Sequence, residues 1–150
     1  MSEQDTQAAG PDKARRLYVF NGGFLSQRRV RRILSLAGYD VRVGNPPVDA
    51  LIGVWGNSPT AHRGLAVAQR RDVPVVRVED AFLRSPFPGR AGAPPLGLLL
   101  DRTGLPFDPA RPSDLAALLA PHPLDGSPLL ARARGAQARA AAAHRPTYTA

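Results

Sequence analysis

The stretch Val73-Pro-Val-Val-Arg-Val-Glu-Asp-Ala-Phe-Leu-Arg-Ser85 decides the fold of this chain. Residues 73–78 form a short apolar run rich in β-branched side chains, which predicts a buried strand. The run ends on two adjacent carboxylates, Glu79 and Asp80. In open α/β sheets, ligands bind just beyond the carboxyl ends of the strands. The paired acids are therefore the first place to look for a catalytic group.

Strands and helices alternate on the N-terminal side of this stretch. We expect strands over 17–20, 39–43 and 50–54, a helix capped by Ser26 that runs to Ala37, and a helix over 61–71 capped by Thr60. This alternation predicts an α/β fold with a Rossmann-like parallel sheet.

The C-terminal side is richer in proline and glycine. We expect a loop over 85–95, short strands over 96–100 and 104–107 in a hairpin around 101–104, a helix over 112–119 with Ser113 near its cap, and an Ala/Arg-rich helix over 129–143. Three parts follow: a disordered leader over 1–16, a Rossmann-like domain over 17–120, and a linker with a terminal helix over 121–150.

Length and composition restrict the class of protein. A chain of 150 residues with 43% hydrophobic content suits one compact domain with its own core. It has no cysteine, which excludes disulfides and thiolate metal sites. No stretch approaches the ~20 apolar residues of a membrane span, and the polar N-terminus does not resemble a signal peptide. We therefore expect a cytoplasmic protein.

The formal net charge of +8 raises the question of a polyanionic partner. Arginine supplies almost all of the positive charge, and its densest cluster is Arg28, Arg29, Arg31 and Arg32. Aromatic residues, on which nucleic-acid bases stack, make up only 6% of the chain. This balance favours a solvated basic face, so no nucleic-acid partner is expected. A non-catalytic binding module for an acidic glycan or nucleic acid is the alternative.

Two glycine-containing loops follow earlier strands and precede helices: one holds Asn21 and Gly22, and the other holds Trp55, Gly56 and Asn57. Backbone N–H groups at a helix start can bind phosphate or carboxylate, although tight turns alone would also explain the glycines. Neither loop matches a dinucleotide or P-loop motif. Trp55 is either a platform for a sugar ring or a packed core aromatic.

His62 lies in the first turn of the second predicted helix, close to the same sheet edge. The three histidines are too far apart for metal-ligand spacing, and we expect neither a metal nor another cofactor. Glu79 and Asp80 lie next to each other on extended backbone, so their side chains should point to opposite faces and cannot form a close dyad. A structural role for the acids at a turn or helix cap remains open.

Taken together, the segments 55–64 and 73–85 resemble the capsule polysaccharide biosynthesis and export family, whose members are bacterial Kdo transferases. The segments 94–104 and 112–119 resemble those that follow in that family, so the likeness runs from about residue 17 to residue 134. Its most specific part is Glu79-Asp80-x-Phe82-Leu83-Arg84-Ser85.

The resemblance implies a domain equivalent to the N-terminal half of a GT-B glycosyltransferase. It implies retaining Kdo transfer from CMP-Kdo to a lipid-linked Kdo acceptor at the inner membrane surface. Glu79-Asp80 is also similar to the acidic motif of bacterial sialyltransferases. By this match Asp80 is the catalytic nucleophile or base, Glu79 supports it, and Arg84 and Ser85 bind the acceptor. Asn21, Gly22, Trp55, Gly56, Asn57 and His62 are the further candidate substrate-binding residues.

The chain departs from the family pattern in three places. Ala81 replaces a glycine beside Asp80, which could shift the backbone there, and Ser58 stands where lysine or a similar residue is common. The family also continues beyond residue 150 into a second domain, whose His-Pro motif binds CMP. His122-Pro123 lies in the expected linker and is not given that role. We therefore expect the isolated chain to be truncated and to have little activity.

Overall fold

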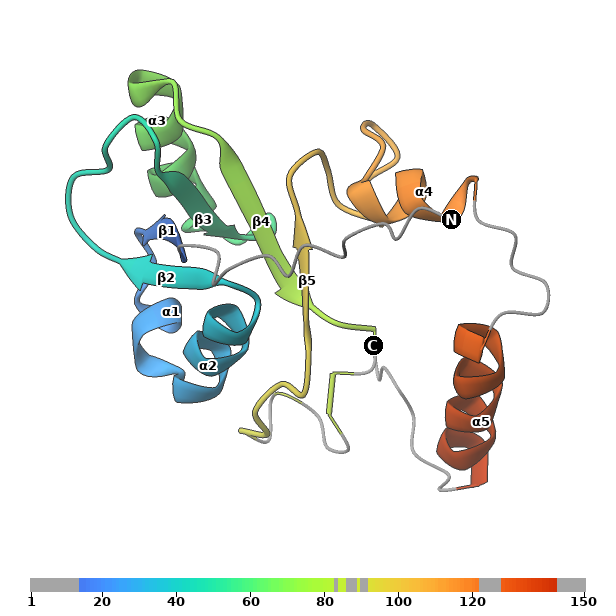
Figure 1. Ribbon diagram of the computed structural model, residues 1–150. Coiled ribbons are helices and arrows are strands. Elements are labelled where there is room, and N and C mark those ends of the chain that lie inside the picture. The colour runs from blue at the N-terminus through green and yellow to red at the C-terminus, as the bar shows by residue number, and fades with distance from the viewer. Residues whose placement is uncertain (1–13, 83, 86–88, 90–91, 122–127, 143–150) are drawn as a thin grey trace, which may run out of the picture.

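The computed structural model describes residues 14–82, 84–85, 89, 92–121 and 128–142. Ten elements follow one another: β1 (Arg15–Val19), α1 (Gly22–Ser26), α2 (Arg28–Leu36), β2 (Tyr39–Arg42), β3 (Leu51–Trp55), α3 (Ala61–Arg71), β4 (Val75–Asp80), β5 (Leu98–Asp101), α4 (Asp114–Leu119) and α5 (Pro128–Ala142). The strands form one sheet in the order β2-β1-β3-β4-β5 (Figure 1).

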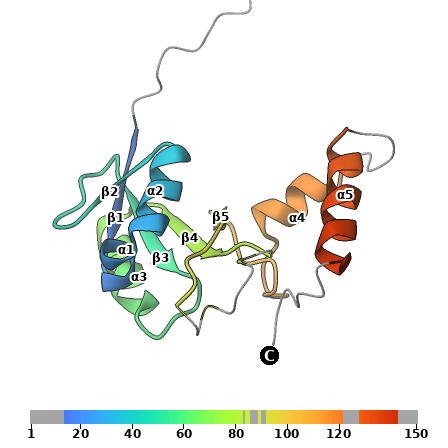
Figure 2. The ribbon, with the colours of Figure 1, turned by 90° about the horizontal axis from the view of Figure 1, so that it is seen from below.

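The sheet is covered on both faces near its centre, as its alternating strand residues require. Leu17 and Val19 of β1 and Val76 and Val78 of β4 pack with α1 and α2 on one face. On the other face, side chains of β3 pack against α3. Figure 2 shows α4 and α5 beyond β5, away from β2. The two-sided core around β1, β3 and β4 confirms the predicted Rossmann-like α/β fold.

One strand runs against the predicted direction. β2, β1, β3 and β4 are parallel, but β5 is antiparallel to β4, with Asp80 opposite Leu98. A parallel neighbour needs a crossover, usually a helix, to carry the chain back. No α-helix lies among the described residues between β4 and β5, and the chain returns as an antiparallel strand. The predicted strand over 104–107 and its hairpin are wrong, because these residues are not in a strand.

Three local predictions also need correction. β1 begins at Arg15, so Arg15 and Arg16 belong to the sheet and not to the leader. The first predicted helix is two helices, because Gln27 between them has extended backbone angles (φ −86°, ψ 94°). Ser26 therefore ends α1 and does not cap a helix. Thr60 precedes α3 without a side-chain cap, since its backbone is helical (φ −97°, ψ −5°) where a cap is extended.

The carboxylate of Asp101 organises the turn between β5 and α4. Asp101 is fully buried and accepts the backbone N–H groups of Thr103 and Gly104 on Oδ1 (2.9 and 2.8 Å) and that of Asp114 on Oδ2 (2.8 Å). Ser113 caps α4 as predicted, by accepting the N–H of Ala116 (3.0 Å). These bonds fasten α4 to the end of the edge strand.

Removing the Asp101 carboxylate should destabilise the domain strongly. Asp101→Ala leaves three N–H groups without an acceptor at a cost of about 1–3 kcal/mol each, so we expect a loss of at least ~3 kcal/mol. Asp101→Asn keeps one acceptor oxygen and should lose roughly 1–2 kcal/mol. Urea denaturation measures both. Asp108→Ala, which removes a single acceptor for the exposed Ala110 N–H, is the matched control and should change stability little. Equal losses for the Ala variants at 101 and 108 would contradict this role.

Candidate active site

The carboxyl ends of β1, β3 and β4 meet at one edge of the sheet because these strands are parallel. β1 leads into Asn21, β3 ends at Trp55 before Gly56, and β4 ends at Asp80. The sequence placed its candidate residues at these strand ends, and the structure brings these ends together. They separate into three groups of contacts.

The first group joins the two glycine-containing loops. Asn21 Nδ2 donates to Thr60 Oγ1 (2.6 Å), and Asn21 Oδ1 accepts the N–H of Gly23, which caps α1 (2.8 Å). Thr60 Oγ1 also lies 3.2 Å from Ser58 Oγ. The loops after β1 and β3 are therefore one connected surface. Gly22 is exposed beside Asn21 at the start of α1.

His62 is exposed in the first turn of α3. Its Nδ1 lies 2.7 Å from the carbonyl oxygen of Pro59, which can only accept, so Nδ1 carries the proton in this contact. Because His62 is exposed, a ligand could reach its ring.

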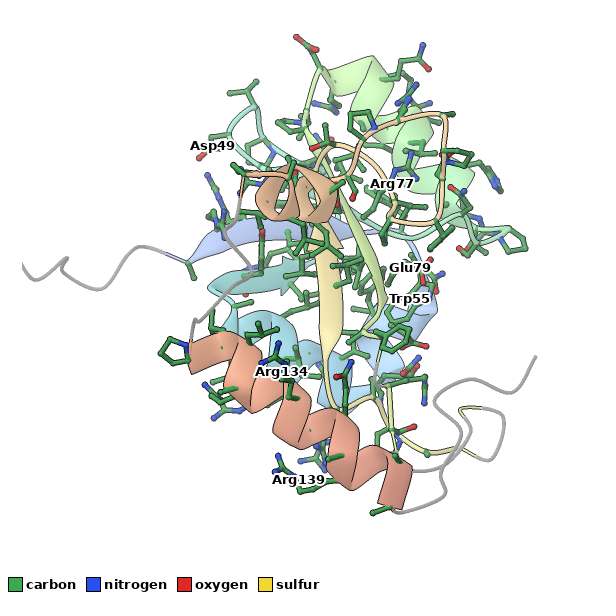
Figure 3. All side chains as sticks on the ribbon, turned by 90° about the vertical axis from the view of Figure 1, so that its right-hand side faces the viewer. Asp49, Trp55, Arg77, Glu79, Arg134 and Arg139 are labelled. Atoms are coloured by element: carbon green, nitrogen blue, oxygen red, sulfur yellow. The ribbon has the colours of Figure 1, made fainter. Side chains whose placement is uncertain are left out.

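The second group surrounds Gly56, whose backbone is in the left-handed region (φ +40°). A Cβ atom at Gly56 would lie 1.5 Å from Oε1 of Glu79, so the Glu79 carboxylate occupies the space that the missing side chain leaves. Arg77 Nη1 donates to the Gly56 carbonyl oxygen (3.1 Å) and, more weakly, to Oδ1 of the exposed Asn57 (3.4 Å). Figure 3 shows Glu79 and Trp55 at the same end of the sheet.

Burial raises the pKa of Glu79, and the nearby Asp80 charge raises it further, against a backbone hydrogen bond from Asp80 that lowers it. The half-buried side chain is thus easier to protonate than an ordinary glutamate. Glu79 can take up or release a proton closer to neutral pH than an exposed carboxyl group.

The third group is built on Asp80. Its Oδ2 accepts from Nε of Arg84 at 2.6 Å, and the two side chains are 21% and 20% exposed. Its Oδ1 is buried and has no hydrogen-bond partner within the described part of the chain. Buried carboxylate oxygens are normally satisfied, so an unsatisfied one marks a candidate functional atom. Arg84 thus fixes one oxygen of Asp80, while the other is buried without a hydrogen bond to a described residue.

Arg84 is itself held by the loop that follows β4. Its Nη1 donates to the Ala93 carbonyl oxygen (2.6 Å) and to Ser85 Oγ (3.3 Å). The Leu96 N–H donates to the Arg84 carbonyl oxygen (2.7 Å), which closes the base of the loop. The predicted loop over 85–95 lies partly outside the described residues. Where it is described, it serves to hold the Arg84 guanidinium against Asp80.

Ala81 does not distort the backbone beside Asp80. Among the described residues other than glycine, only Asp72 has a positive φ. The Ala81 N–H donates to the Gly97 carbonyl oxygen (3.4 Å), which continues the pairing of β4 with β5. Alanine therefore fits here where the resemblance led us to expect glycine.

Trp55 is packed into the core cluster that α1 and α2 cover. Its ring meets that of Phe24 edge to face, with centroids 5.5 Å apart and planes at 65°. This contact supports the second of the two roles considered for Trp55, that of a packed aromatic side chain. Trp55 supports the loop that holds Gly56.

Sequence reasoning missed three contributors to this edge: Thr60, Arg77, and the arginines of α2 that face the Arg84 loop. A threonine before a helix reads as a cap, and an arginine within an apolar strand gives no sign of its partner. Among the described residues, no group of three or more histidine, aspartate or glutamate side chains could hold a metal ion. No described helix is long and apolar enough to cross a membrane.

The mostly parallel sheet defines a Rossmann-like domain. Its carboxyl edge is a candidate active site, because it carries two acids and two glycine-containing loops that hydrogen-bond to each other. The family model described as "Capsule polysaccharide biosynthesis protein" matches residues 49–145 of this chain. The chain belongs to this capsule polysaccharide biosynthesis family, as its sequence resemblance predicted.

The individual relatives agree with this membership. The capsule polysaccharide modification protein LipA of Neisseria meningitidis serogroup A is 32% identical over 126 residues, which cover 81% of this chain and 18% of LipA. The lipopolysaccharide-processing protein LpsZ of Rhizobium meliloti is 48% identical over 52 residues, 35% of this chain and 12% of LpsZ. The chain thus spans less than a fifth of these relatives.

A solved structure is similar over most of the chain. The beta Kdo 2,4 transferase KpsC of Thermosulfurimonas dismutans matches with a TM-score of 0.74 and 25% sequence identity, covering 91% of this chain and 42% of that one. This match confirms the predicted fold class, an α/β domain of the GT-B glycosyltransferase type.

Gly56→Ala should push the Glu79 carboxylate out of its position. The variant meets two costs: left-handed backbone strain, about 1–2 kcal/mol for a residue with a Cβ, and the clash with Glu79. Only the strain should remain in a Glu79→Ala background. Denaturation of the two single variants and the double variant should therefore give a coupling free energy of at least ~0.5 kcal/mol. Additive effects would show that the two residues do not contact each other.

The stability of the Glu79→Gln variant relative to the wild type should increase as pH rises. A carboxyl group whose pKa is raised by folding binds its proton more tightly in the native state, so the wild type loses stability as pH rises through the native pKa. Gln keeps the acceptor oxygen for the Asp80 N–H and does not ionise. Urea denaturation at about pH 4 and about pH 7 should show the variant gaining on the wild type at the higher pH. A difference independent of pH would refute the raised pKa.

Proposed function

We propose that this chain is the acceptor-side domain of a Kdo transferase that works in capsular polysaccharide biosynthesis, with Asp80 as its catalytic carboxylate. The observation that carries the proposal is the buried Oδ1 of Asp80 at the carboxyl edge of the sheet, which has no hydrogen-bond partner among the described residues. The structural likeness to a beta Kdo 2,4 transferase supports it. The donor would be CMP-Kdo and the acceptor a lipid-linked Kdo.

Asp80 Oδ1 would act on the anomeric carbon of Kdo. In a retaining mechanism the carboxylate oxygen bonds to this carbon while the bond to the CMP phosphate oxygen breaks, and CMP leaves with the electron pair. An acceptor hydroxyl then attacks the same carbon, Asp80 leaves, and the hydroxyl proton passes to a base. Arg84 holds Oδ2, and Oδ1 has no hydrogen bond to another described residue, so Oδ1 would attack once the atoms that bury it move aside.

Neighbouring side chains would position the reacting groups. Arg84 orients Asp80, because its Nε is bonded to Oδ2 and its Nη1 to the loop, which makes it a positioning residue. Glu79 would support the site by filling the space beside Gly56. Ser85, exposed in part beside Arg84, would hydrogen-bond an acceptor hydroxyl.

This domain would act together with a donor-binding domain. The chain matches 42% of the transferase structure, and the family resemblance assigns CMP to a second domain. We therefore expect little turnover from the 150 residues alone. Joined to the part of KpsC that it does not cover, the chain should transfer Kdo, at a surface where lipid-linked acceptors are presented.

Asp80→Asn should abolish transfer by the joined protein. Loss of a nucleophile or essential base should lower kcat at least ~10²-fold with little change in KM. Glu79→Gln should have a smaller effect. A mass-spectrometric assay with CMP-Kdo and a lipid-linked Kdo acceptor measures both, and Asp40→Asn, the same change at β2 away from this edge, is the control. Near-normal kcat for Asp80→Asn would make Asp80 a structural residue.

Binding and transfer measurements on the same joined protein distinguish the proposed transferase from a non-catalytic binding module. A module for polyanions would bind an unrelated polyanion tightly, lose that binding steeply with added salt, and be indifferent to Asp80→Asn. A transferase would instead show product whose formation depends on Asp80. Salt-dependent polyanion binding without any product would overturn the proposed function.

A further inference from the structure

A cavity of about 660 Å³ lies between the junction of α1 with α2 and the loop that follows β4. Its wall includes Gln27, Arg28 and Arg29 from the helix side and Arg84, Gly92 and Ala93 from the loop side. Arg84 reaches both this cavity and Asp80. A ligand in the cavity would therefore lie one side chain away from the candidate catalytic carboxylate.

Three guanidinium groups line this cavity, and no acidic residue is found among its described lining residues. Arg84 is committed to Asp80, Ser85 and Ala93. Arg28 and Arg29 are exposed, and neither forms an ion pair with another described residue. The sequence reading gave Arg84 the task of binding an anionic acceptor, but the free positive charges of the cavity belong to Arg28 and Arg29.

The placement of these two arginines is locally unfavourable. They occupy the first turn of α2, whose dipole is positive at that end, and this turn has no acidic residue and no side-chain cap from Gln27. Cations at this end of a helix are less favourable than at the opposite end. A local arrangement that works against stability indicates a functional site when it lines a cavity. An anion in the cavity would reverse this effect.

We propose that this cavity binds the carboxylate of a sugar acid, with Arg28 and Arg29 as its binding residues and the acceptor as its source. The inference rests on the proposed function, which places an acidic acceptor sugar next to Asp80. Guanidinium groups bind carboxylates through charge-assisted, often paired hydrogen bonds. The volume lies within the roughly 300–1,000 Å³ of small-molecule sites and would admit a sugar-acid unit.

The test uses the 150-residue chain and three probes: free Kdo, the neutral methyl mannoside, and CMP. NMR titration or calorimetry should show binding of Kdo and none of methyl mannoside at the same concentration. Arg29→Gln should weaken Kdo binding about tenfold or more, as loss of a charge-assisted hydrogen bond does. Arg32→Gln is the matched control: it lies on the same helix but lines a different cavity, so Kdo binding should stay unchanged.

Three results would overturn the inference. Kdo could bind no better than methyl mannoside, Arg29→Gln could match Arg32→Gln, or CMP could bind with the same dependence on Arg29 and displace Kdo. The last result would assign the cavity to the donor phosphate. Arg29-dependent Kdo binding without transfer by the joined protein would refute the proposed function alone. Transfer without such binding would refute only the sugar-acid cavity.

Discussion

The ion pair of Asp80 with Arg84 is the constraint on which the candidate active site depends. It links the last residue of β4 to the following loop, whose base is closed by the bond between Leu96 and the Arg84 carbonyl oxygen. Both side chains are about four-fifths buried, so removing one leaves the other as an unpaired, largely desolvated charge. The antiparallel return through β5 brings Ala93 to Arg84 and so completes the support of the acid.

Much of the fold could be predicted from the sequence, because strands that are buried on both faces and alternate with helices leave few arrangements. α3 has the predicted bounds, and β4 ends on the predicted acids. The errors arose where long-range contacts outweigh local pattern. The direction of β5 depends on the connection and not on its own residues, and the break at Gln27 leaves no mark in the hydrophobic spacing of α2.

The sequence predicted where the candidate site lies, but it did not predict which side chains contact one another there. Strand ends follow from apolar runs, which located Asn21, Gly56 and Asp80 at one edge. The partners of these residues come from distant segments: Thr60 for Asn21, 39 positions along the chain, and Arg77 for Gly56, 21 positions along. Spacing along the sequence carries no information about such pairs. The cavity at Arg28 and Arg29 likewise requires the junction of α1 with α2 and the loop after β4 to come together.

The negative charges of the two acids at this edge are offset in the structure. Two adjacent acids would be expected to repel an acidic substrate, yet each is compensated in a different way. Arg84 neutralises the Asp80 charge, and burial raises the pKa of Glu79, so ionisation of that carboxyl is disfavoured. Arg28 and Arg29 of α2 then add positive charge to the cavity that Arg84 also lines. A carboxylate or phosphate in the cavity would thus meet arginines first, because Arg84 lies between the cavity and the candidate carboxylate of Asp80.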